Sequence, residues 1–344
     1  MRNLLLGAAL LLPAALPAPS QAATAWVSSN HIQVIDLDTA QIVGRIPLKE
    51  FIHDMEFSPD GARVYVASSH GLRIADAVGL QFTHQLAQGS TLSVSVSGDG
   101  ASLVALEKGD DDAALAARKA GQPLPVARVT VYAAGTLTAT ATWEVPGTAR
   151  DVLLARDGSA VYVLEPAMGQ ILVFGADGAA RESIDVAPGP RAATGHAQAI
   201  YSSMEMSPDG SRVLIPTTSE AASSVVDVSL SGERAERVIV QDLGHRRRIQ
   251  GVAWDEDGSG MYVTAVNNVV KFTGAGEPVS WAETTLNYVD VAPVPGTAQT
   301  VMVAPTFSSA RRSGGVSLLD GNGSVVRSVE LPDMSPFHVA VSPR

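Results

Sequence analysis

The sequence predicts an all-β fold built from a repeated unit of four strands, and two observations support this prediction. A turn of the Ser-Pro-Asp-Gly type recurs along the chain, at 58–61, 97–100, 155–158, 207–210, 255–258 and, in degraded form, 293–296. Proline sets φ at the second position of such a turn, and glycine supplies a positive φ at the last. An apolar, β-branched stretch follows each turn, as at 63–67 and 160–164, and this pattern is typical of buried strands.

The spacing of the copies indicates the architecture. A four-stranded unit that repeats every ~40–45 residues is the period of a propeller blade. A seventh copy is split between the chain ends: 337–344 supply one strand, and 25–28, 32–37 and 42–46 supply the other three. Closing the ring removes strand edges that would otherwise invite aggregation. We therefore predict a seven-bladed β-propeller in which the C-terminal strand joins the N-terminal three and buries Phe337, Val339 and Val341.

The repeats resemble a known family. The segments that carry the resemblance are SPDGARVYVAS at 58–68, HGLRIADAV at 70–78 and NHIQVIDLDTAQIVGRIPL at 30–48. They are similar to the YVTN-type repeats of seven-bladed propellers, which are related in architecture to WD40 proteins. The resemblance extends over residues 23–344 and implies one domain with this fold. It implies no particular activity, because propellers host many unrelated functions.

The first 22 residues have the features of a secretory signal peptide. Arg2 precedes an apolar stretch at 4–16, and Ser20 and Ala22 place small residues at −3 and −1 of a cleavage site. Three prolines and the short apolar stretch argue against a membrane anchor. We expect cleavage after Ala22, no membrane span after cleavage, and a periplasmic or secreted protein.

The amino-acid composition narrows the range of possible functions. The 344 residues include no cysteine and carry a net charge of −11. The sequence therefore excludes disulfides, a thiolate nucleophile and covalently attached c-type haem, and its acidity disfavours nucleic-acid binding. The histidines lack zinc-site spacing and no Gly-x-Ser-x-Gly motif occurs. We predict no cofactor and no metal, and the sequence leaves open whether the protein is an enzyme.

Positions at the start of each predicted inner strand should ring the mouth of the central channel. Counting back from each turn gives pairs such as His53 with Asp54 and Arg150 with Asp151. A convergent polar pocket is a default binding-site hypothesis. Hydration of a water-filled channel is the alternative, and we give it more weight. The candidate ligand-binding residues are His53, Asp54, Arg150, Asp151, Tyr288 and His338.

Every long or irregular connection is predicted on the face where the inner strands begin. These connections are a helix-like insertion at 109–126, and the segments 188–201, 245–248 and 306–315. Long loops on a rigid scaffold are where binding usually occurs. Two arginine clusters on this face could bind an acidic partner, although solvated basic loops are the plainer interpretation. The candidate partner-binding residues are Arg246, Arg247, Arg248, Arg311 and Arg312.

Three functions fit the sequence. The first is an exported, non-catalytic binding platform for a protein or small ligand on the long-loop face. The second is the propeller subunit of a quinone-cofactor amine dehydrogenase, which segments 128–137, 153–164 and 329–335 resemble. That resemblance implies a smaller partner that carries the quinone. The third is a lactonase-like sugar-acid hydrolase, for which no residue can be assigned.

Overall fold

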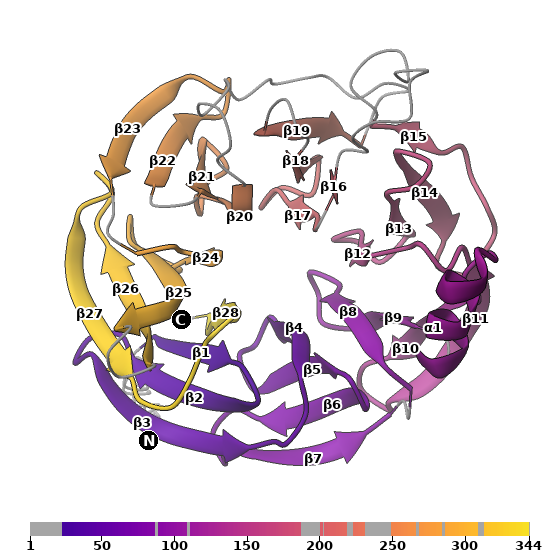
Figure 1. Cartoon of the computed structure of the whole chain (residues 1–344), viewed down its shortest axis with the longest axis horizontal. Helices are drawn as coiled ribbons and strands as arrows, with labels where there is room; N and C mark the ends of the chain where they lie inside the picture. The colour runs from indigo at the N-terminus through magenta and orange to yellow at the C-terminus, as the bar shows by residue number, and fades with distance from the viewer. Residues whose placement is uncertain are drawn as a thin grey trace, which may run out of the picture.

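Seven four-stranded antiparallel sheets surround a central channel in the computed structural model (Figure 1). The structure describes residues 23–343 except 87–88, 109–110, 187–199, 202, 219–222, 231–248, 266–267, 284–285 and 309–312. The predicted seven-bladed propeller is confirmed. The predicted signal peptide at 1–22 lies outside the described residues.

The first blade joins the two ends of the chain, as predicted. Its sheet order places β28 (His338–Val341) beside β1 (Thr24–Ser28), followed by β2 (His31–Asp36) and β3 (Gln41–Pro47). The register pairs Ala25 with Val341 and Ser28 with His338. Val339 is buried, but Phe337 is 38% exposed. The expected burial of Phe337 is therefore wrong, because this residue lies just before the strand, at the rim of the channel.

The other blades follow in chain order, with the lowest-numbered strand nearest the channel. The second contains β4 (Ile52–Phe57), β5 (Arg63–Ser68), β6 (Gly71–Asp76) and β7 (Gln81–Gln85). The third contains β8 (Thr91–Val96), β9 (Ser102–Glu107), β10 (Ala127–Ala133) and β11 (Thr138–Val145). The fourth contains β12 (Asp151–Leu154), β13 (Ala160–Glu165), β14 (Gln170–Gly175) and β15 (Ile184–Asp185).

The last three blades complete the ring. The fifth contains β16 (Ile200–Tyr201), β17 (Glu205–Met206), β18 (Arg212–Thr218) and β19 (Ser223–Ser229), and both short strands pair with β18. The sixth contains β20 (Ile249–Trp254), β21 (Gly260–Ala265), β22 (Asn268–Thr273) and β23 (Pro278–Glu283). The seventh contains β24 (Asp290–Pro293), β25 (Thr300–Ser308), β26 (Ser313–Leu319) and β27 (Val325–Leu331).

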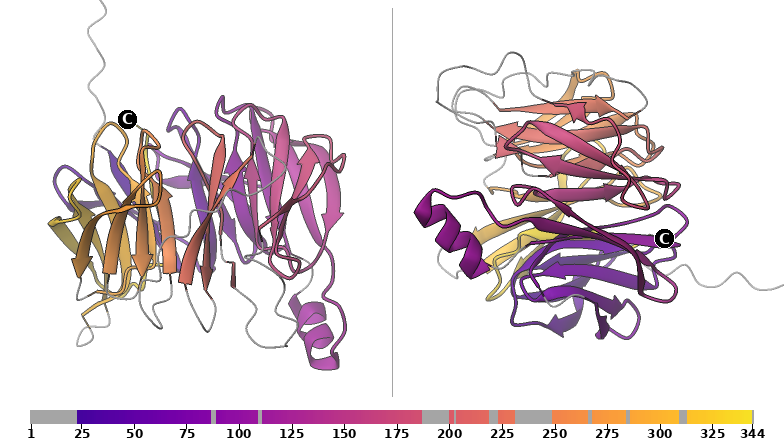
Figure 2. Two further views of the ribbon diagram at one scale, coloured as in Figure 1. Left: turned by 90° about the horizontal axis from the view of Figure 1, so that it is seen from above. Right: turned by 90° about the vertical axis from the view of Figure 1, so that its right-hand side faces the viewer.

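A single helix interrupts this pattern in the described part of the chain. Helix α1 (Asp111–Ala120) connects β9 to β10 and projects from one face of the disc (Figure 2). Gly121 follows it with φ of 66°, which is the left-handed conformation that ends many helices. The predicted helix-like insertion is confirmed. No helix among the described residues is both long and apolar enough to cross a membrane.

The core consists of apolar clusters shared by neighbouring blades. Trp26 of β1 meets Phe57 of β4 edge to face, with ring centroids 5.6 Å apart. Val27, Val303 and Val339 pack in one cluster that joins the first and seventh blades. Burying such a side chain contributes ~1.5–3 kcal/mol, so the inter-blade contacts hold the ring closed.

The repeated turns have the predicted geometry. In the second blade, Ser58 N donates to Arg63 O at 2.9 Å and Gly61 N donates to Ser58 O at 2.8 Å. Gly61 has φ of 68°, where a Cβ atom would be strained. The turns therefore lie together on the face opposite to α1, at the ends of the inner strands.

The turn of the seventh blade is shifted by one residue. There the equivalent bonds run from Val294 N to Gln299 O and from Thr297 N to Val294 O. The turn therefore begins at Val294, whereas the sequence alignment placed its start at Pro293. Gly296, with φ of 73°, occupies the third position of this turn instead of the fourth.

Candidate functional site

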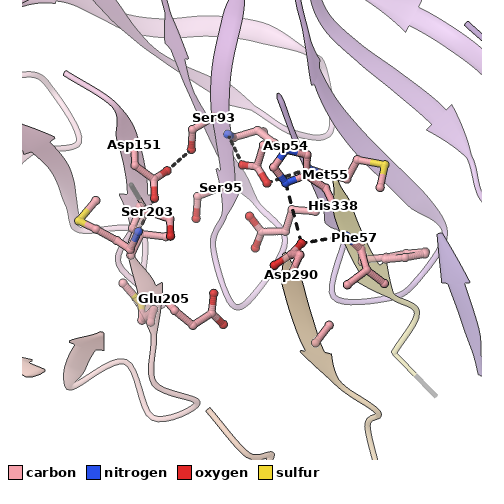
Figure 3. Close-up of a pocket in the computed structure, with 18 of the residues that line it drawn as sticks. Asp54, Met55, Phe57, Ser93, Ser95, Asp151, Ser203, Glu205, Asp290 and His338 are labelled. Atoms are coloured by element: carbon pink, nitrogen blue, oxygen red, sulfur yellow. Dashed lines mark hydrogen bonds and ion pairs between the residues drawn. The ribbon is translucent and has the colours of Figure 1, made fainter. Parts of the chain in front are cut away.

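A cavity of about 620 Å³ lies in the central channel, lined by the inner strands of all seven blades (Figure 3). Antiparallel blades direct these strands from the α1 face to the turn face, so their first residues surround one mouth. We call the residues at equivalent first positions the mouth ring. It consists of Asp54, Ser93, Asp151, Ser203, Gly251, Asp290 and His338.

Five of the six residues predicted to bind a ligand line this cavity: His53, Asp54, Arg150, Asp151 and His338. They come from β4, β12 and β28 or from the residue just before a strand. The structure thus brings them together at one end of the channel. Their role in binding a ligand stays a prediction.

Tyr288 is absent from the cavity lining. Its side chain is buried at 1% exposure, and its hydroxyl donates to Ser317 Oγ at 2.8 Å inside the seventh blade. The shifted turn explains the error, because it moves the alignment by one residue. Asp290 takes the mouth-ring position instead of Val289, and Val289 takes the place assigned to Tyr288.

The three aspartates of the mouth ring make the same pair of hydrogen bonds. Asp54 Oδ1 accepts the amide N–H of Met55 at 2.8 Å, and its Oδ2 accepts that of Val94 in the next blade at 3.0 Å. Asp151 and Asp290 repeat the pattern: their second oxygens accept the amides of Met204 at 2.5 Å and Val339 at 2.9 Å. Each carboxyl therefore joins two blades and has a fixed orientation.

Ser93 and His338 make further contacts with the aspartates of the mouth ring. Ser93 Oγ donates to Asp151 Oδ1, and it accepts the amide of Val152 at 3.3 Å. Across the channel, His338 Nδ1 lies 3.9 Å from Asp290 Oδ2, beside Asp54 (Figure 3). Asp54, Asp290 and His338 thus form one group, and Asp151 with Ser93 forms another.

Two further carboxyls lie deeper in the channel. Side chains alternate along a strand, so residues two positions apart face the same side. Glu56 and Glu205 lie two positions after Asp54 and Ser203 and line the cavity. Glu56 Oε2 accepts the amide N–H of Val96 at 3.1 Å. Neither glutamate was predicted from the sequence, because the prediction considered only the strand starts, although the period of two could have found them.

Burial keeps these carboxyls from ionising easily. Desolvation, reinforced by the charge of Asp151, raises the pKa of Asp54 to about 7. Desolvation likewise raises the pKa of Asp290 to about 7, and with the charge of Asp290 it raises the pKa of Glu205 to about 8. Glu56 and Asp151 also have raised pKa values for the same reason. The site is therefore partly protonated near neutral pH.

The pKa of the histidine in the mouth ring shifts in the opposite direction. Burial, with a smaller effect of the charge of His53, lowers the pKa of His338 to about 4. At pH 7 the imidazole is neutral, so its contact with Asp290 is not an ion pair. The lining also contains His53, Arg150 and Arg156, together with five carboxyls.

Two further predictions concern a metal site and the arginine clusters. No group of three or more histidines and carboxylates in the described part of the chain is arranged to hold a metal ion. Both arginine clusters fall outside the described residues, at 231–248 and 309–312. Their role in partner binding stays a prediction.

Comparison with known proteins supports the fold class. No protein-family model matches the chain, and no curated protein matches it. Among solved structures, hydrazine synthase of Kuenenia stuttgartiensis aligns with a TM-score of 0.58 and 18% identity, over 78% of this chain and 76% of that one. A functionally unknown protein from Desulfotomaculum acetoxidans DSM 771 aligns with a TM-score of 0.68 and 14% identity, over 93% and 99%. At these identities the likeness concerns the fold alone.

Proposed function

We propose that this protein is an exported, non-catalytic propeller that binds a partner protein or small ligand at the mouth ring, on the face that carries α1. The observation that supports this proposal is the convergence of Asp54, Asp151, Asp290 and His338 around one cavity. Backbone amides of the next blade hold the three aspartates in place. A concave site whose polar groups are already oriented loses little entropy when it binds.

The surroundings of Ser93 favour binding over acyl transfer. A serine nucleophile needs a neighbouring general base, most often histidine. The Ser93 hydroxyl instead donates to Asp151 and accepts a backbone amide. Its proton is thus directed to a carboxyl that the fold uses to join two blades.

Cross-linking in the native cells tests this proposal. The protein is purified with its partners after lysine and carboxyl cross-linking, and the cross-links are mapped by mass spectrometry. We expect cross-links at α1 and around the inner-strand starts. Cross-links confined to the turns at 58–61, 155–158 and 207–210 would mean that the opposite face is the binding face.

The same purification tests the amine dehydrogenase alternative, which rests on the resemblance of segments 128–137, 153–164 and 329–335. A small co-purifying chain that carries a quinone would support that alternative. An unrelated exported protein would support the binding platform. N-terminal sequencing of the same sample tests export, since we expect the mature chain to begin at Ala23.

A further inference from the structure

Two exposed phenylalanines stand at the rim of the mouth ring. Phe51 is 47% exposed and Phe337 is 38% exposed. Their ring centroids lie 5.8 Å apart, and Phe51 also meets His53 with centroids 5.1 Å apart. Phe337 and His53 belong to the lining of the cavity. An apolar, aromatic surface therefore borders the entrance to an acidic channel.

Two carboxyls of the mouth ring adjoin this rim, one on β4 and one on β24. Asp54 follows His53 on β4, and Asp290 lies against His338, the residue after Phe337. Figure 3 shows Asp54, Asp290 and His338 side by side. A group that rests on the two rings therefore reaches two carboxyls within the same part of the channel.

A hydrogen-bond acceptor without a donor lies in the same lining. Gln250, one residue before the mouth-ring position of the sixth blade, has a buried Oε1 atom with no partner in the described structure. A buried acceptor without a donor is costly. The lining of the cavity therefore includes a residue with an unsatisfied polar atom.

We propose that the mouth ring receives a lysine or arginine side chain of a partner protein, with its aliphatic stem on Phe51 and Phe337 and its charged group at Asp54 and Asp290. This inference rests on the proposed function, because it specifies the chemistry of the partner. Lysine and arginine combine an apolar stem with a cationic head, and cations are attracted to aromatic faces. The lining holds five carboxyls, whose charged forms a bound cation favours, and these supply the charge complementarity.

Binding should release protons from the site. Asp54 and Asp290, each with a pKa of about 7, are partly protonated at neutral pH, and a bound cation favours their charged forms. The groups that face them are the carboxyls Glu56, Asp151 and Glu205, the histidines His53 and His338, and Arg150 and Arg156. Among these groups the carboxyls also have raised pKa values, and they add to the release.

Calorimetry with model peptides tests the proposal. The probes are capped pentapeptides with serine at four positions and lysine, arginine, norleucine or glutamate at the centre. They are titrated into the protein that lacks residues 1–22. We expect lysine and arginine peptides to bind at least about tenfold more tightly than norleucine, which keeps the stem without the charge. Equal binding of norleucine, or preference for glutamate, would overturn the proposal.

Two double variants and a matched control show where on the protein the lysine peptide binds. Asp54→Asn with Asp290→Asn should weaken lysine-peptide binding about tenfold or more, and Phe51→Ala with Phe337→Ala should weaken it about threefold. Asp60→Asn with Asp209→Asn makes the same two substitutions on the turn face and should change the Kd less than about twofold. A control that weakens binding as much as the mouth variant would contradict the assignment.

Proton release gives a measurement that needs no variant. At pH 7, binding enthalpies of the unaltered protein measured in Tris and in phosphate should differ, corresponding to release of about half a proton or more. Binding of the lysine peptide without any buffer dependence would count against Asp54 and Asp290. If native cross-links map to the mouth while these peptides fail to bind, the partner chemistry is wrong and the binding platform stands.

Discussion

Two rings of aspartates lie at opposite ends of the inner strands, and their pKa values shift in opposite directions. In the turns, Asp209 accepts the Ser207 hydroxyl at 2.6 Å and the amide of Ser211 at 3.0 Å, and these bonds lower its pKa to about 2. At the mouth, Asp54 also accepts two amides, yet its pKa rises to about 7. The other turn aspartates with lowered pKa values are Asp60, Asp99, Asp157 and Asp257.

The difference shows which effect dominates in each ring. Hydrogen bonds to a carboxylate favour its charged form in both places. The turn aspartates remain in water, so hydrogen bonding decides their pKa. In the channel, desolvation and neighbouring negative charges outweigh bonds of the same kind. The turn ring stabilises the fold with exposed charge, whereas the mouth ring holds partly protonated carboxyls whose charged forms a cationic ligand would favour.

Removing the closing strand should have the largest effect on the mouth ring. A chain that ends at Pro336 lacks β28, and with it His338 and the Val339 amide that orients Asp290. Losing buried side chains costs ~1.5–3 kcal/mol each, against a total stability of roughly 5–15 kcal/mol. We expect insoluble or molten protein by circular dichroism and calorimetry.

The Phe337→Ala variant is the control for this truncation, because it keeps the strand and changes only the exposed rim. It should melt cooperatively near the temperature of the unaltered protein. A truncated chain that also melts cooperatively at that temperature would show that the ring does not need β28.

The dependence of stability on pH should separate the two rings. A carboxyl whose folded pKa is raised stabilises the fold when protonated, and this stability is lost as pH rises from about 4 through the folded pKa. Asp54, Asp290 and Glu205, with pKa values of about 7, 7 and 8, should together lower the free energy of unfolding by a few kcal/mol between about pH 6.5 and 8.5. His338, with its pKa near 4, acts in the opposite direction between about 4 and 6.5. Urea unfolding at pH 6.5 to 8.5 avoids that overlap.

Asp54→Asn with Asp290→Asn is the matched variant for this experiment. It should flatten the decline in unfolding free energy above pH 6.5, because two of the titrating groups are gone. A decline of unchanged slope would mean that other groups control stability in this range.

The sequence predicted most of the mouth ring because the same turn motif recurs in successive blades at a fixed distance after the start of the inner strand. Each turn fixes which residues of the neighbouring strands are equivalent between blades. One motif therefore locates Asp54, Asp151 and His338 together. Where the turn loses that motif, the alignment slips by one residue, which is why the prediction included Tyr288 and missed Asp290. The raised pKa of Asp54 could not be predicted in this way, because desolvation depends on side chains from other blades.

Substituting a turn aspartate should lower the stability of the fold moderately, and only because its hydrogen bonds are lost. Asp209→Ala removes the acceptor of the Ser207 and Ser211 bonds, which should cost about 1 kcal/mol of unfolding free energy. Because a lowered folded pKa adds stability above the unfolded pKa, this cost should be constant above pH 5 and fade as pH falls toward 2. Asp209→Asn, which keeps an acceptor, should recover part of it. A cost that grows between pH 6 and 8 would contradict the difference between the rings.

The smallest effect on stability should come from the Tyr288→Phe variant. This variant also tests the corrected alignment of the seventh blade. The Tyr288 hydroxyl donates to Ser317 Oγ, which also contacts Ser328 Oγ at 3.1 Å, so Ser317 keeps a partner after Tyr288→Phe. The variant should therefore lose unfolding free energy at the low end of the ~0.5–1.5 kcal/mol that one hydrogen bond contributes, measured by urea unfolding. Its affinity for the lysine peptide should be unchanged, whereas Asp290→Asn should weaken binding. If Tyr288→Phe weakens peptide binding more than Asp290→Asn does, then the mouth ring of the seventh blade has been assigned to the wrong residue.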